Sequence, residues 1–83
     1  MGKLYIPVRV HISEEGRITP EQIQAGYDGE WVIVEKVTDS RRRASLRAGT
    51  VGIRYSCVVN INETQKHIYL FDECGKWFIE VEE

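Results

Sequence analysis

The sequence has few of the features that usually identify the class of a protein. Two cysteines among 83 residues are too few for a disulfide scaffold. No apolar run approaches the roughly 20 residues that a membrane-spanning helix needs. The N-terminus shows no charged segment followed by an apolar core, so we expect no secretory signal peptide. We therefore expect one small cytoplasmic domain, residues 1–83, with reduced thiols.

Sequence motifs for chemistry are equally scarce. Metal-ligating residue types occur at His11, Cys57, His67 and Cys74, but no close pair such as C-x-x-C joins them, so we expect no metal. There is no glycine-rich phosphate loop, no G-x-S-x-G and no H-E-x-x-H, so we expect no cofactor and no enzyme activity. The one alternative for nucleophilic catalysis is Cys57 or Cys74 with His67, and of these Cys57 and His67 lie on neighbouring predicted strands.

Basic residues are concentrated in one segment. Residues 36–54 carry six basic side chains and one acidic one, a formal charge of +5, whereas the rest of the chain carries −7, which gives the net −2. Within it, residues 39–50 hold helix-forming residues between a possible cap at Asp39 or Ser40 and Gly49. They predict one or two helical turns or a long basic surface loop.

Alternating apolar residues predict five or six short β-strands. The first covers residues 4–12, where Pro7 indicates an edge strand or a bulge. Residues 31–37 are almost continuously apolar, as in a central strand that Asp39-Ser40 would end. Residues 51–81 alternate in three strands separated by turns, which is typical of a meander.

Residues 17–25 allow two interpretations. Thr19 as N-cap with Pro20 at the first position is typical of a helix start. The Asp28-Gly29 step instead favours a hairpin and hence an extended segment over 16–26, which we prefer.

These elements predict an all-β fold. A small, strongly bent antiparallel sheet, or an SH3-like or OB-like barrel, covers its own core with few residues and few open edges. The expected core holds the Val and Ile residues together with Trp31, Tyr69, Phe71, Trp77 and Phe78.

The basic segment is the candidate binding site, and the residues expected to contact a ligand are Arg41, Arg42, Arg43, Arg47, Arg54 and Tyr55. Arginines meet carboxylates and phosphates in forked geometry. An acidic protein partner, or a homodimer using the C-terminal glutamates, is the leading expectation. Single-stranded nucleic acid is the alternative, with Tyr5, Tyr27 and Tyr55 as stacking platforms. We expect no membrane partner.

The second half of the chain resembles a group of small uncharacterised bacterial proteins. The residues that carry the resemblance are 39–42 (DSRR), 44–49 (ASLRAG), 52–57 (GIRYSC), 69–71 (YLF) and 77–80 (WFIE). The resemblance implies a bacterial origin and a stand-alone domain, and it supplies no activity. It also suggests that the basic segment and residues 52–55 form one unit. In that unit Arg54 either pairs with a carboxylate such as Glu80 or binds a ligand.

Overall fold

The fold is a single curled antiparallel sheet. A computed structural model describes residues 2–25, 29–44 and 51–81. Its strands are β1 (Gly2–Tyr5), β2 (Val8–Ile12), β3 (Ile18–Gln24), β4 (Trp31–Ala44), β5 (Val51–Ile61), β6 (Thr64–Glu73) and β7 (Lys76–Val81). The spatial order is β1-β7-β6-β5-β4-β3-β2, and every neighbouring pair is antiparallel. The predicted all-β, strongly bent sheet is therefore confirmed.

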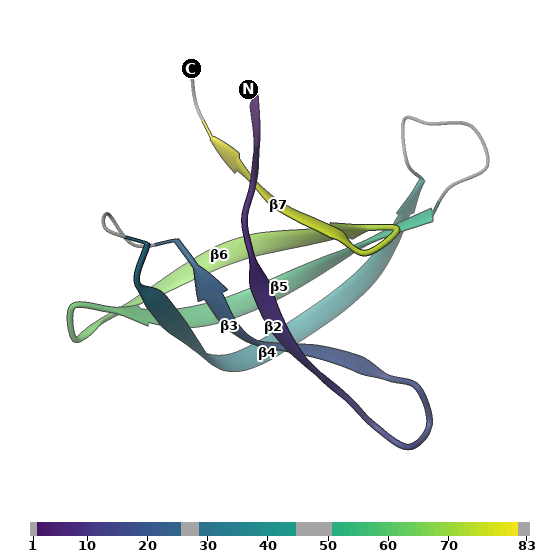
Figure 1. Ribbon diagram of the computed structural model, residues 1–83, viewed down its shortest axis with the longest axis horizontal. Coiled ribbons are helices and arrows are strands. Elements are labelled where there is room, and N and C mark those ends of the chain that lie inside the picture. Colours follow the sequence, from purple (N-terminus) through teal and green to yellow (C-terminus); the bar gives the residue numbers. More distant parts are fainter. Residues whose placement is uncertain (1, 26–28, 45–50, 82–83) are drawn as a thin grey trace.

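The first and last strands of this order are two halves of one N-terminal segment. Ile6 and Pro7 separate β1 from β2, because a proline interrupts a strand by removing a backbone donor. The Ile6 N–H donates to the Trp77 carbonyl and the Pro7 carbonyl accepts from the Gln24 N–H, both at 3.0 Å. The N-terminal segment thus bridges the two ends of the sheet (Figure 1). Its division into β1 and β2 gives seven strands where the sequence predicts five or six.

Tight turns join β5 to β6 and β6 to β7, as the sequence predicts. Asn62 and Glu63 both have positive φ, at 51° and 63°, and the turn at Cys74 and Gly75 is of the same kind, at 55° and 83°. Two successive residues with positive φ match the right-handed twist of a two-residue hairpin. The meander over residues 51–81 is confirmed. Strand β3 (Ile18–Gln24) lies within the extended segment expected over 16–26, so the helix start at Thr19 is wrong.

Strand β4 differs from its predicted course. It does not stop at Asp39-Ser40 but continues to Ala44, paired with β5 throughout. Its register shifts twice, after Val34 and after Val37, so that Glu35 and Thr38 are extra residues in bulges. Bulges bend a strand without ending it, and here pairing overrides helix propensity. Residues 39–44 are neither helix nor loop, and residues 45–50 lie outside the described part.

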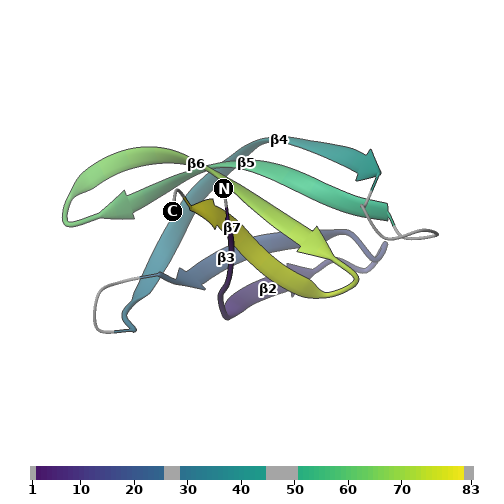
Figure 2. The same cartoon turned by 90° about the horizontal axis from the view of Figure 1, so that it is seen from above.

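The core lies between two layers. Strands β4, β5 and β6 form one arched layer, and the β2–β3 hairpin lies across from it (Figure 2). We call the face of β4–β6 toward the hairpin the inner face and the opposite one the outer face. The buried cluster between the layers consists of Ile23, Val32, Val34, Tyr55, Cys57, Val59 and Leu70.

Some aromatic residues of the predicted core lie elsewhere. Phe71 and Phe78 are buried, but as a stacked pair on the outer face with ring centroids 4.9 Å apart. Trp31 and Trp77 are only partly buried, and Tyr69 is 47% exposed. Because successive strand residues point to opposite faces, the inward Leu70 directs Tyr69 and Phe71 outward. The prediction of Tyr69 as a core residue is therefore wrong.

Candidate binding site

The basic segment is split between the two faces of the sheet. Arg41 on β4 lies directly opposite Arg54 on β5, and both face outward. Arg42 lies opposite Ile53 on the inner face, where its side chain is exposed at the end of the sheet. Arg43 is described only as a strand residue opposite Gly52, and Arg47 lies outside the described residues. Of the predicted set, the structure brings together Arg41 and Arg54.

Tyr55 is not part of this pair. Its side chain is 5% exposed and lies on the inner face, where its ring stacks on Trp77 at 5.4 Å. Its hydroxyl donates to the Ile18 carbonyl at 3.3 Å, which ties β5 to β3. Burial raises its pKa. Tyr55 therefore joins the two layers and offers no exposed ring beside the arginines.

Arg41 is held by a neighbouring carboxylate on its own strand. Its Nε donates to Asp39 Oδ2 at 2.8 Å, and both side chains are exposed. This hydrogen bond holds the pKa of Asp39 below its ordinary value, and Asp39 raises the pKa of Arg41 in return. Asp39 and Arg41 thus form an exposed ion pair on the outer face, and the charge of Arg54 also contributes to lowering the pKa of Asp39.

Arg54 is held by an aromatic ring instead. Its guanidinium carbon lies 4.7 Å from the centroid of the Tyr69 ring, and the edge of that ring packs against His67 at 5.1 Å. Arg54 Nε is buried and has no hydrogen-bond partner. The expected partner Glu80 lies in register with Lys3, whereas Arg54 is in register with Phe71, which pairs with Phe78. The ion pair between Arg54 and Glu80 is therefore not formed.

The sequence contained a signal for Tyr69 that the assignment to the core overlooked. In residues 66–71, Ile68 and Leu70 alternate with His67 and Tyr69. Ile68 and Leu70 lie opposite the inward-facing residues Cys57 and Tyr55 of β5, so they also face inward. Strand alternation then places His67 and Tyr69 outward. The contact between Arg54 and Tyr69 depends on the register in which β5 pairs with β6. Composition does not reveal that register.

Three aromatic or cationic groups extend the outer face toward β1. Tyr5 is 53% exposed and meets Phe78 edge-on at 5.5 Å. Lys3 Nζ lies 4.7 Å from the Phe78 ring centroid and 3.2 Å from Glu73 Oε1. Tyr27, the other expected platform, lies outside the described residues. This part of the face is aromatic, and its lysine is paired.

The candidate catalytic pair is separated by the sheet. Cys57 is fully buried on the inner face, in register with Ile68, whereas His67 is in register with Val58 and faces outward. Burial raises the pKa of the Cys57 thiol to about 11, so the thiol is neutral and unreactive at neutral pH. Both cysteines are free, with Cys74 exposed in a turn. The structure does not bring Cys57 and His67 together.

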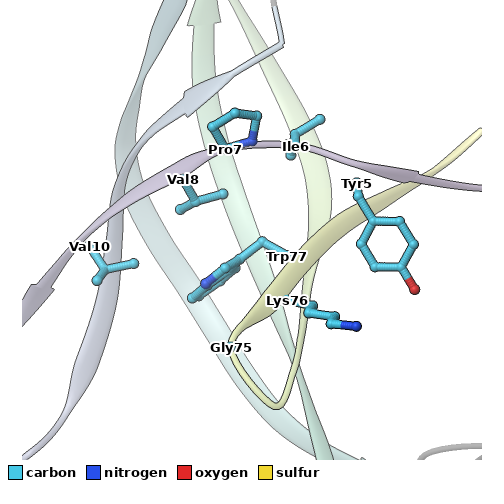
Figure 3. A pocket seen from close by; sticks show the side chains of 8 residues that line it. All are labelled: Tyr5, Ile6, Pro7, Val8, Val10, Gly75, Lys76 and Trp77. Carbon is cyan, nitrogen blue, oxygen red and sulfur yellow. The ribbon is translucent and has the colours of Figure 1, made fainter.

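A separate hollow of about 800 Å³ lies under the N-terminal segment (Figure 3). Its lining includes the apolar side chains of Pro7, Val8, Val10 and Trp77 together with Lys76. Trp77 extends toward Val8 and Val10. The hollow shares no residue with the arginine pair, and its lining offers one charged group.

Among residues 2–25, 29–44 and 51–81, no group of three potential metal ligands comes together. That part of the chain also contains no helix long and apolar enough to cross a membrane. Comparison with family models, curated proteins and solved structures finds no match.

Proposed function

We propose that the protein is a non-enzymatic binding module that recognises an acidic segment of a partner protein through Arg41, Arg54 and Tyr69. The observation that carries the proposal is the state of Arg54. Its guanidinium is positioned by Tyr69, it lies opposite a second arginine, and its buried Nε has no partner. Directly opposed like charges are unfavourable, and a buried unpaired donor is costly. A carboxylate that reaches the partly exposed Arg54 guanidinium from the outer face relieves the repulsion between the two arginines.

The charge around the pair favours a compact acidic ligand over a long polyanion. Asp39 already matches Arg41, and Glu73 matches Lys3. Nucleic acid binding depends on many phosphate contacts in a row. Arg54 with Arg41 beside it provides one short cationic site on a chain of net charge −2, which suits one or two carboxylates.

Single-stranded nucleic acid is the second candidate, and one observation favours it. Tyr5 and Tyr69 are each about half exposed and face the same side of the sheet. Bases stack on exposed aromatic rings beside cationic groups. In this alternative Arg41 and Arg54 contact phosphates, and affinity falls steeply with added salt.

The test compares two anionic probes on matched variants. Isothermal titration with octaglutamate and with an oligothymidylate of eight nucleotides is performed on the native protein, Arg54→Gln and Arg9→Gln. Arg9 is a suitable control because its guanidinium also stacks on an aromatic ring, Trp31 at 4.0 Å, on a different part of the sheet. We expect octaglutamate to bind the native protein and Arg9→Gln but not Arg54→Gln.

Two results would contradict this proposal. Equal octaglutamate affinity in all three proteins would remove Arg54 from the site. Tighter, strongly salt-dependent binding of the oligothymidylate would establish nucleic acid as the ligand instead. Thermal melting of each variant verifies that the native fold is retained.

A further inference from the structure

The sheet opens between β3 and β4. These strands pair only through residues 22–24 and 31–33. Toward its N-terminal end, β3 pairs with β2 alone, while β4 continues alongside β5 to Ala44. The two strands diverge into separate layers, so the C-terminal part of β4 is separated from the β2–β3 hairpin (Figure 2).

A cleft of about 790 Å³ occupies this opening. One wall is formed by residues 37–40 of β4 and the other by residues 15–19 of the β2–β3 turn. Ile53 and Tyr55 of β5 line its floor, where the Tyr55 hydroxyl bonds to the Ile18 carbonyl. Val37 and Ile53 are packed against the apolar core. The cleft therefore has an apolar floor beside the edge of a strand.

The edge beside the cleft is regular. Residues 39–44 pair with β5 without a register shift. Within the described part of the chain, no strand pairs with the other side of these residues. Such an edge presents a row of backbone donors and acceptors that can pair with an added strand. The two bulges lie before it, at Glu35 and Thr38, and leave this stretch suitable for pairing.

We infer that an extended acidic segment of a partner protein binds by adding as a strand to residues 39–44 of β4. The inference rests on the proposed function and states how the acidic segment is held. Main-chain hydrogen bonds to β4 give affinity, and alternate side chains give specificity. The partner's residue opposite Arg41 faces outward, where a carboxylate meets that guanidinium, and Arg54 lies one strand beyond Arg41 on β5. The neighbours of that partner residue face the cleft, above the side chains of Ile53 and Tyr55.

Charge argues against a second copy of this chain as the occupant. In a two-fold antiparallel arrangement of the two edges, the arginines at 41–43 of one copy would face the same arginines of the other. Like charges directly opposite each other disfavour strand pairing. An acidic segment reverses the sign of that interaction.

The test uses a capped eight-residue peptide of alternating glutamate and valine. Two further versions carry N-methyl groups on the backbone nitrogens, one at every glutamate and the other at every valine. A strand at an edge directs alternate N–H groups toward its neighbour and away from it. Binding is measured by isothermal titration, and amide shifts of residues 38–42 locate it. A lysine–valine peptide of the same length controls for charge.

Strand addition predicts an unequal effect of the two methylations. We expect one methylated peptide to bind at least about ten-fold more weakly, through lost hydrogen bonds, and the other to keep most of its affinity. The lysine–valine peptide is expected not to bind. Equal affinity of all three glutamate–valine peptides would overturn strand addition while leaving acidic recognition intact.

Other outcomes would overturn the inference in different ways. If octaglutamate binds and the glutamate–valine peptide does not, recognition needs only carboxylates and strand addition is wrong. If neither binds, both the inference and the proposed function are wrong. If sedimentation shows that the peptide-free protein is a dimer, and the double variant Arg41→Glu, Arg42→Glu is a monomer, a second copy occupies the edge and the inference is overturned.

Discussion

Arg54 takes its position from an aromatic neighbour, and its charge also helps to lower the pKa of Asp39. Pairing register sets it diagonal to Tyr69, and its guanidinium lies over that ring. A ring face accepts the charge of an arginine without occupying its N–H groups, although the Nε of Arg54 is itself buried. The contact with Tyr69 thus fixes the side chain of Arg54 without satisfying its hydrogen-bond donors.

The role of Tyr69 is tested by one substitution that removes its ring and one that keeps it. We expect Tyr69→Ser to weaken octaglutamate binding by about two- to five-fold, since an exposed cation–π contact contributes about 0.5–1 kcal/mol. Tyr69→Phe retains the ring and is expected to bind like the native protein. Titration calorimetry gives both values. Equal affinity in Tyr69→Ser would show that the ring does not position Arg54.

The buried thiol of Cys57 makes the free energy of unfolding depend on pH in the alkaline range. Its pKa is raised from 9.0 to about 11 by burial, so the unfolded thiol ionises at a lower pH than the folded one. The contribution of Cys57 to stability is complete below about pH 9 and is lost as the pH rises toward about 11. Urea unfolding at pH 8 and pH 10 measures the free energy of unfolding at each pH. We expect it to decrease less between these pH values in Cys57→Ala than in the native protein. An identical decrease in both proteins would contradict this.

At the scale of strands, the sequence predicts where segments are extended better than where they end. Alternation located the meander over residues 51–81 because one face of each strand is buried. The end of β4 was missed because its two bulges interrupt the alternation while β5 continues to pair with it. The Arg41–Arg54 pair depends on that continuation, so local sequence did not reveal it.

The turn between β5 and β6 offers a test of hairpin geometry. Glu63 has a φ of 63°, a conformation that costs a residue with a side chain about 1 kcal/mol. Glu63→Gly creates the Asn-Gly sequence that such turns prefer, and we expect it to raise the free energy of unfolding by about 0.5 kcal/mol. Glu63→Ala, the matched control, is expected to give no gain. Urea denaturation measures both, and a loss of stability in Glu63→Gly would contradict the turn assignment.

At the scale of the whole molecule, the N-terminal segment holds the curled sheet together. Its hydrogen bonds at Ile6 and Pro7 reach Trp77 at one end of the strand order and Gln24 near the other. The sequence predicted an interruption at Pro7, but local patterns could not show that the two halves pair with opposite ends of the sheet. This contact is formed between residues far apart in the chain.

The bridging role predicts how the backbone exchanges its amide protons. We expect the Ile6 and Gln24 amides to exchange only through global unfolding, because releasing either one requires the sheet to uncurl. Native-state hydrogen exchange across low urea concentrations reports this directly. Exchange of these two amides at the rate of the exposed turns, such as residues 14–16, would show that the segment opens on its own.

The most direct test of the binding account follows the Arg54 Nε–H group itself by NMR. This donor is buried without a partner, and the account predicts that octaglutamate shifts its resonance and that of the Arg41 amide in a saturable manner. The Arg9 Nε–H resonance, on a different part of the sheet, is expected to stay in place. Saturable binding that leaves the Arg54 resonance unchanged, with shifts instead at Val8, Val10 and Trp77, would contradict the account.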